Sequence, residues 1–159
     1  MSVRMTQEEA SAFLDQAHTG ILTTLRRDGM PIALPVWFVT DEGRVYVATP
    51  AKTKKVGRVR RDDRVSFLVE SGKRWAELKA VQLNGRARVV DAPDRIARVL
   101  DLLDAKYAGF RTSRAAMPAR TKEHYGGGRA VLEIVPDGRV LSWDNTKLKI
   151  GEPDAASES

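Results

Sequence analysis

The stretch TPAKTKKVGRVRRDDR, residues 49–64, connects two short apolar runs and contains seven lysine and arginine side chains. The runs on either side, residues 45–48 and 65–69, are rich in β-branched and aromatic residues, which indicates strands. The stretch therefore predicts a turn and a basic helix between two strands. Backbone N–H groups at the start of such a helix bind anions. We interpret this stretch as a phosphate-binding segment, with a nucleic-acid surface and a merely solvated face as alternatives.

Length and composition predict a globular protein of one domain. The chain has 159 residues, 42% of them hydrophobic and 30% charged. Residues 1–150 are expected to form a single domain, and residues 151–159, which are rich in alanine, serine and acidic residues, a disordered tail. No apolar run approaches the roughly 20 residues of a membrane span, and residues 1–9 lack the apolar core of a signal peptide. We therefore expect a cytoplasmic protein that does not contact a membrane.

The residue types that carry most side-chain catalysis are scarce in this chain. There is no cysteine, and His18 and His124 are the two histidines. This excludes disulfides, thiolate nucleophiles and zinc–thiolate centres, and we predict neither a catalytic side chain nor a metal site. If the protein is an enzyme, a bound cofactor is expected to supply the chemistry. The net charge of +6 favours an anionic ligand without identifying it.

The hydrophobic pattern predicts many short strands and few helices. Thr6 and Glu9 have the spacing of a capping box. Pro93 is suited to the first turn of another helix. Besides the basic helix, two helices are predicted, over residues 7–17 and 94–107. The expected strands are residues 21–25, 31–40, 44–49, 64–70, 80–91, 129–135 and 139–143.

The turns between these strands predict an antiparallel arrangement. Residues 21–49 are expected to form a meander of three strands, in which Pro35 indicates an edge or a bulge. A turn at residues 136–138 separates the last two strands, and residues 108–128 are assigned to a loop or short helix. The predicted fold class is mainly β (α+β), a six- to seven-stranded antiparallel split β-barrel with a few peripheral helices.

Several motifs, taken in order, resemble a known family. The resemblance extends over residues 6–149 and depends on the order and spacing of the motifs more than on any one of them. The segments are GILTTL at 20–25, DGMP at 28–31, PVWF at 35–38, YVAT at 46–49, TKK at 53–55, RRDDR at 60–64, residues 81–85 and VLSWD at 140–144. The sequence is similar to the split-barrel flavin and deazaflavin oxidoreductases related to pyridoxamine 5′-phosphate oxidase.

The resemblance implies a cofactor site and a homodimer with that site at the subunit interface. Hydroxyl and lysine groups in and before the basic helix match the family's phosphate-binding pattern, and further cations, Arg58 among them, suit a longer anionic tail. The strand around Trp37 matches the one that carries the flavin ring, and Val81 and Trp143 match positions near the cofactor. The implied cofactor-binding residues are Pro35, Val36, Trp37, Thr49, Thr53, Lys54, Lys55, Arg58, Val81 and Trp143.

The chain departs from the vitamin B6 oxidases of this family at two places. Its C-terminal part has no histidine after His124, and Ala80 stands where the family often has a glutamine that binds the flavin. We therefore do not expect oxidation of vitamin B6. The resemblance implies FMN or F420 as the cofactor and does not decide between them. Other branches of the family bind haem.

The implied function is an oxidoreductase that transfers hydride or electrons from the bound cofactor to a small conjugated substrate. A cofactor carrier or sensor without turnover is the alternative. A nucleic-acid-binding barrel is disfavoured, because residues 52–64 contain no aromatic side chain for base stacking.

Three further features are interpreted as structural. His18 follows the first predicted helix, where an imidazole can interact with the helix C-terminus. Trp75 is expected in the core or in an interface. Asp144 and Lys147 are expected to pair with each other.

Overall fold

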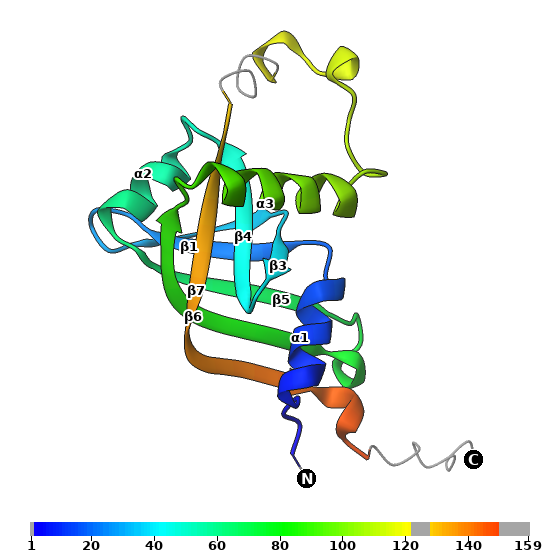
Figure 1. Cartoon of the computed structure of the whole chain (residues 1–159). Helices are drawn as coiled ribbons and strands as arrows, with labels where there is room; N and C mark the ends of the chain where they lie inside the picture. The colour runs from blue at the N-terminus through cyan, green and yellow to red at the C-terminus, as the bar shows by residue number, and fades with distance from the viewer. Residues whose placement is uncertain (1, 122–127, 150–159) are drawn as a thin grey trace, which may run out of the picture.

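The protein is a seven-stranded antiparallel sheet that curls into a half-barrel, with few helices around it (Figure 1). The computed structural model describes residues 2–121 and 128–149. This is the mainly β split-barrel class predicted from the sequence. The predicted tail, residues 151–159, lies outside the described residues. In the described part of the chain, no helix is both apolar enough and long enough to cross a membrane.

The sheet has the order β2-β1-β5-β6-β7-β4-β3. Its strands are β1 Gly20–Leu25, β2 Pro31–Val36, β3 Val39–Asp41, β4 Arg44–Pro50, β5 Arg64–Ser71, β6 Lys79–Val89 and β7 Arg129–Asp144. The α-helices are α1 Gln7–Gln16, α2 Lys54–Arg61 and α3 Pro93–Lys106, and the short 3-10 turns are η1 Trp75–Glu77, η2 Arg114–Ala116 and η3 Asn145–Lys147. Residues 21–49 do not form the predicted meander, because β2 and β3 lie at opposite edges of the sheet.

The helix ends follow local chemistry. The Thr6 side chain accepts a hydrogen bond from the Glu9 N–H at 3.1 Å, so the capping interaction predicted for α1 is confirmed. Pro93 occupies the first turn of α3, where its missing N–H has no intrahelical partner to lose. The basic segment forms a helix of only two turns, α2.

The predicted strand 31–40 is interrupted. β2 ends at Val36, and the N–H of Phe38 donates to the Tyr107 hydroxyl at 2.9 Å instead of to a neighbouring strand. The expectation of an edge for Pro35 is confirmed, since β2 is the outermost strand and Pro35 pairs with Ile21 of β1.

The predicted strands 129–135 and 139–143 are one long, bent strand, β7 (Figure 1). The turn expected between them is therefore wrong. β7 pairs with both β4 and β6 as far as Ile134, and beyond Pro136 it pairs with β6 alone among the described strands. At the bend, a Cβ atom on Gly85 would lie 2.2 Å from the Val135 carbonyl oxygen. Only glycine permits this close approach of β6 and β7.

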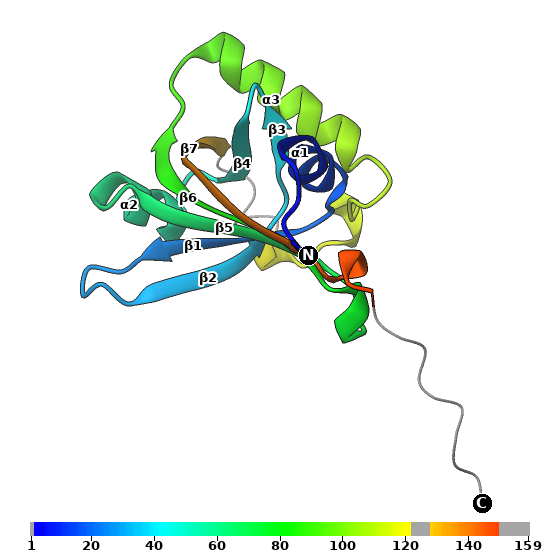
Figure 2. The ribbon, with the colours of Figure 1, turned by 90° about the horizontal axis from the view of Figure 1, so that it is seen from below.

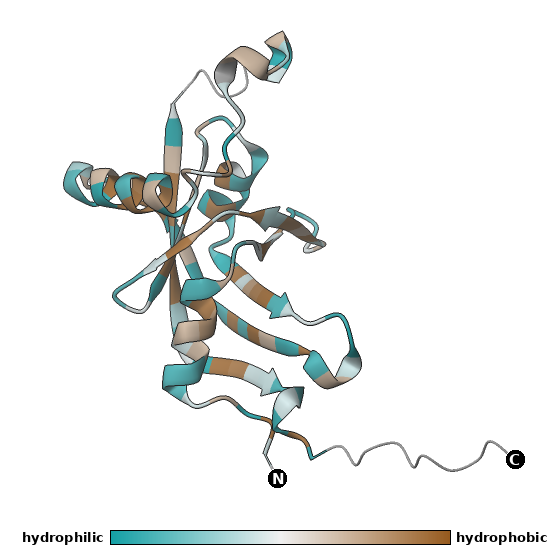
Figure 3. Cartoon of the chain, turned by 90° about the vertical axis from the view of Figure 1, so that its right-hand side faces the viewer, coloured by the Kyte–Doolittle hydropathy of each residue, from teal (hydrophilic) through white to brown (hydrophobic). Residues whose placement is uncertain are grey.

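Two apolar clusters hold the fold together. The larger lies inside the curl of the sheet, where side chains from six strands meet Ala10 of α1 and Val56 and Val59 of α2. The smaller lies beneath α3, where Val99 and Leu103 pack on β3, β4 and β7. Figure 2 shows α3 and α2 on different sides of the sheet. Alternating apolar and polar bands along the strands in Figure 3 match this arrangement.

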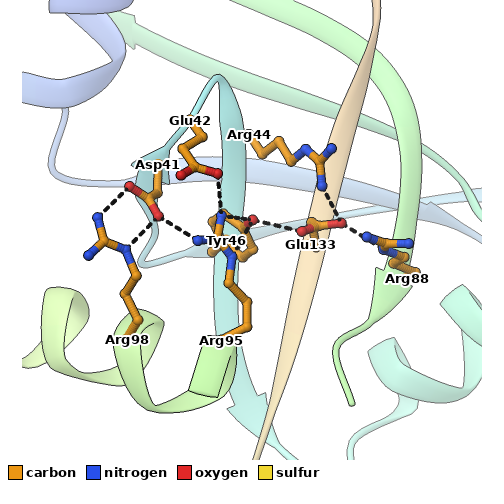
Figure 4. A network of polar contacts seen from close by, with 8 residues as sticks. All are labelled: Asp41, Glu42, Arg44, Tyr46, Arg88, Arg95, Arg98 and Glu133. Atoms are coloured by element: carbon orange, nitrogen blue, oxygen red, sulfur yellow. Dashed lines mark hydrogen bonds and ion pairs between the residues drawn. The ribbon is translucent and has the colours of Figure 1, made fainter. Parts of the chain in front are cut away.

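A buried carboxylate connects the sheet to its surroundings (Figure 4). Glu133 is 2% exposed and accepts hydrogen bonds from the Tyr46 hydroxyl at 2.7 Å and from Arg88 at 2.6 Å. Arg44 pairs with the same group at 3.2 Å. Burial opposes ionisation of Glu133, but these donors outweigh it and hold its pKa below the ordinary value. The Tyr46 hydroxyl also accepts a hydrogen bond from Arg95 of α3. The network therefore fixes α3 on the sheet.

The residues interpreted as structural have other partners than predicted. Lys147 pairs with Glu9 at 2.8 Å, and Asp144 lies 3.8 Å from Lys79, so the predicted Asp144–Lys147 ion pair is wrong. Trp75 is 64% exposed and therefore does not belong to the core of this chain.

Candidate functional site

A cavity with a volume of about 1400 Å³ lies at one end of the sheet. Its walls are the ends of β2 and β4, the start of α2, the last turns of α3 and the segment 110–121. In Figure 1 this segment arches from α3 towards the start of β7. Six of the residues predicted to bind a cofactor line the cavity, namely Pro35, Val36, Trp37, Thr49, Thr53 and Lys55. We call this cavity the main pocket.

One end of the main pocket has the features of an anion site. Thr53 is the N-cap of α2 but makes no side-chain capping hydrogen bond to any described residue. Its hydroxyl lies 3.2 Å from the hydroxyl of Thr49, a residue that is 3% exposed. The backbone N–H groups of the first helical turn have no intrahelical acceptors. The N–H groups of the first turn of α2 and the hydroxyls of Thr49 and Thr53 therefore lie close together at this end of the pocket, where they can bind an anion.

Lys55 adds a cation to the same end. Its side chain is half-buried and faces the main pocket. Desolvation, and secondly the charge of Arg58, lower the pKa of Lys55, and no carboxylate of the described residues offsets this. A bound phosphate would supply the missing negative charge.

The other end of the main pocket is aromatic. The Trp37 ring stacks on Tyr107 with 4.3 Å between centroids and 1° between planes. The Tyr107 hydroxyl accepts from the Phe38 N–H and lies 2.8 Å from the His18 carbonyl oxygen, to which it can donate. Burial raises the pKa of Tyr107, which keeps this donor protonated. The indole of Trp37 is thus fixed as a flat, rigid wall.

His18 packs against these aromatic rings and does not cap α1. The C-cap of α1 is Ala17, and the imidazole packs edge-on against Tyr107, at 5.3 Å, and Phe110, at 4.6 Å. His124, the other histidine considered, lies outside the described residues.

The loop after α3 was expected to contribute to the pocket walls, but the sequence did not identify its individual pocket residues. Phe110, Arg111, Met117 and Pro118 line the main pocket, as does Arg129 at the start of β7. The segment 108–128 has no regular periodicity, so no sequence signal distinguished these side chains.

Two predicted cofactor residues lie on another face of α2. Lys54 and Arg58 line a separate, open pocket of about 620 Å³, together with Arg26, Arg27 and Arg61. We call this surface the outer cationic face. The Arg58 Nε atom donates to the Thr24 hydroxyl at 2.7 Å, which gives Arg58 a structural role as well.

The remaining two predicted residues lie away from both pockets. Val81 is fully buried in the inner core, and Trp143, on the distal half of β7, is 38% exposed. Trp143 pairs with Ala80 of β6. Their predicted contact with a cofactor depends on a second subunit and stays a prediction.

The main pocket can bind a flat molecule that carries an anionic group. Among the described residues, no group of three or more histidine, cysteine, aspartate or glutamate side chains could hold a metal ion. The pocket instead combines backbone donors and a cation at one end with rigid aromatic surface at the other.

One family model and several solved structures match this chain. The model of the pyridoxamine 5′-phosphate oxidase family matches residues 6–140. A conserved hypothetical protein from Mycobacterium tuberculosis superposes with a TM-score of 0.80 at 29% identity, over 99% of this chain and 96% of that one. The comparison with curated proteins gave no match.

Two more distant structures share the fold. The heme storage protein of Vibrio cholerae has a TM-score of 0.66 at 13% identity, over 90% of this chain and 96% of its own. A protein named F420 reductase has a TM-score of 0.60 at 21% identity, over 82% of this chain and 94% of its own.

Proposed function

Because the chain belongs to the pyridoxamine 5′-phosphate oxidase family, we propose that its main pocket binds FMN or F420 and that the protein is an oxidoreductase. The observation that carries the proposal is the open N-terminus of α2 beside a half-buried lysine. Thr53 leaves the helix uncapped within the described structure, and no described carboxylate perturbs Lys55. These groups fit a phosphate.

Each wall of the main pocket has a role in this proposal. The hydroxyls of Thr49 and Thr53 donate to the phosphate, and Lys55 neutralises it. Pro35 and Val36 would contact the ring of the cofactor, and Trp37, fixed by its stack on Tyr107, would exclude water from it. A bound flavin or deazaflavin ring would supply the hydride or electron chemistry needed to reduce a small conjugated substrate. The protein contributes binding, orientation and a dry site.

The outer cationic face offers a way to separate the two cofactors. Lys54 and Arg58 point away from the main pocket, so a ligand reaches them only if it extends over α2. F420 carries a polyglutamate tail and FMN does not. If the ligand is F420, Lys54→Gln weakens its binding while FMN binding is unchanged.

We also propose that the protein acts as a homodimer with Val81 and Trp143 near the shared site. Beyond Pro136, β7 carries the exposed side chains Val140, Leu141 and Trp143 and pairs only with β6 among the described strands. An exposed apolar strand of this kind is a frequent protein interface. Sedimentation of the wild type is expected to give a dimer, and of Leu141→Glu a monomer. A wild-type monomer in the presence of cofactor contradicts the dimer.

The decisive experiment is a visible-absorption titration of the purified protein with FMN and with F420. Saturable binding of either, followed by reduction of a conjugated acceptor under steady-state conditions, is the expected result. Binding without turnover would make the protein a carrier, as the name of the Vibrio cholerae heme storage protein illustrates for this fold. Binding of neither cofactor contradicts the proposal.

A further inference from the structure

Two guanidinium groups share one carboxylate at the edge of the main pocket. Asp104 of α3 accepts a hydrogen bond from the Arg111 Nη2 atom at 2.8 Å, and the Arg129 Nη1 atom lies 3.5 Å from the same oxygen. All three residues line the main pocket. The group therefore carries one positive charge in excess, separate from that of Lys55. An additional anion in the main pocket would balance it.

Arg111 brings this excess positive charge close to the aromatic wall of the main pocket. Its guanidinium carbon lies 5.7 Å from the centroid of the Trp37 ring. The neighbouring residue, Phe110, lines the main pocket and is 62% exposed. A large apolar ring left exposed inside a pocket indicates contact with an apolar ligand surface. A flat ligand that lies against Trp37 and Phe110 would place a substituent at Arg111.

The size of the main pocket leaves space for such a ligand beside a cofactor. Single-ligand pockets commonly measure roughly 300–1000 Å³, whereas the main pocket measures about 1400 Å³. Its anion site at the start of α2 already matches a phosphate. Arg111 belongs to the segment that follows α3, at the aromatic end, and suits the second molecule.

We propose that Arg111 is a substrate-recognition residue and that the substrate class is a planar, conjugated carboxylate. Arg111 binds the carboxylate through its forked N–H groups, and Asp104 orients the guanidinium. Trp37 and Phe110 contact the conjugated body of the substrate. This inference rests on the proposed function for the identity of the first ligand, and it adds the charge and shape of the second.

The test compares two probes of equal shape, 2-naphthoate and neutral 2-naphthamide, binding to the cofactor-loaded protein in calorimetric titrations. The wild type is expected to prefer naphthoate by about tenfold or more, the size of a charge-assisted hydrogen bond. Arg111→Gln abolishes the preference, and Arg111→Lys retains part of it. Arg120→Gln is the matched control, since Arg120 lies in the same segment but does not line the main pocket. Circular dichroism verifies that each variant is folded.

The outcomes separate this inference from the proposed function. Equal binding of the two probes by the wild type, binding of neither, or an unchanged preference in Arg111→Gln overturns the inference even if FMN or F420 binds. A loss of cofactor affinity in Arg111→Gln with no loss of naphthoate also overturns it, because Arg111 would then contact the cofactor. If no cofactor binds but the free protein shows the Arg111-dependent preference, the inference stands and the proposed function fails.

Discussion

Lys54 and Lys55 are neighbours in the sequence, yet they lie in two different regions of the molecule. Lys55 is half-buried in the main pocket, beside free helix N–H groups. Lys54 is exposed on the outer cationic face, among arginines that the solvent screens. Successive residues of an α-helix point about 100° apart. A run of cations therefore indicates a site only when burial and neighbouring donors select one of its members.

The largest effect on FMN binding should come from reversing the charge of one of these two lysines, and the two substitutions should differ. Lys55→Glu is expected to weaken FMN binding at least about tenfold, because it places a carboxylate against the phosphate in a partly desolvated site. Lys54→Glu should change the affinity less than about twofold, since its charge is exposed. Absorbance titrations measure both. Equal losses would remove the distinction between the two faces.

Removal of the Arg58 side chain should lower the stability of the fold without changing the affinity for FMN. Thr24 is 1% exposed, and in Arg58→Met its hydroxyl loses the Arg58 Nε donor at 2.7 Å. We expect a loss of about 1 kcal/mol or more in the free energy of unfolding, measured by urea denaturation. The affinity for FMN should be unchanged. A selective loss of FMN binding would assign Arg58 to the phosphate site instead.

The outer cationic face also has room for an added methyl group. A Cβ atom on Gly57 would meet no atom within 4 Å, and Gly57 lies inside α2. Gly57→Ala should therefore stabilise the protein by about 0.5–1 kcal/mol through helix propensity, with FMN binding unaffected. Thermal unfolding monitored by circular dichroism measures the gain. Destabilisation would indicate that this face is covered in the native assembly.

The smallest effect concerns pH. Desolvation and Arg58 lower the pKa of Lys55 in the free protein, and a bound phosphate favours its protonated form. Binding is therefore linked to proton uptake, and the affinity falls as the pH rises through the lowered pKa. Titrations above neutral pH should show this fall in the wild type and in Lys54→Met, and a weaker one in Lys55→Met. Identical profiles for all three would contradict the role of Lys55.

The sequence could predict that Thr49, Thr53 and Lys55 lie at one end of the main pocket because their grouping is local. Thr49, Thr53 and Lys55 lie within one strand–helix connection, where hydroxyls, a cation and a helix start follow one another. Whether a given lysine faces the pocket depends on where α2 begins. A shift of one residue in that start would exchange Lys54 with Lys55, and the sequence does not fix the start so closely.

The aromatic end depends on long-range packing that the sequence does not specify. Trp37 was assigned to a continuous strand, but Tyr107, a residue 69 positions beyond Phe38, takes the hydrogen bond that continuation of that strand would need. Arg111 reaches the pocket only because α3 lies across the sheet. The bend of β7 was mistaken for a turn, since proline and glycine at 136 and 138 mark both features.

The pairing of β4 with β7 has a consequence for how the protein folds. Val45 pairs with Ile134 and Thr49 with Ala130, so strands about 85 residues apart must meet before the wall that carries Thr49 is complete. Contacts this distant in sequence make folding slow, because loop closure precedes any gain from pairing. During synthesis, β4 cannot form this pairing until β7, the last of the described strands, has been made. The wall of the main pocket that carries Thr49 therefore forms only after β7 has been synthesised.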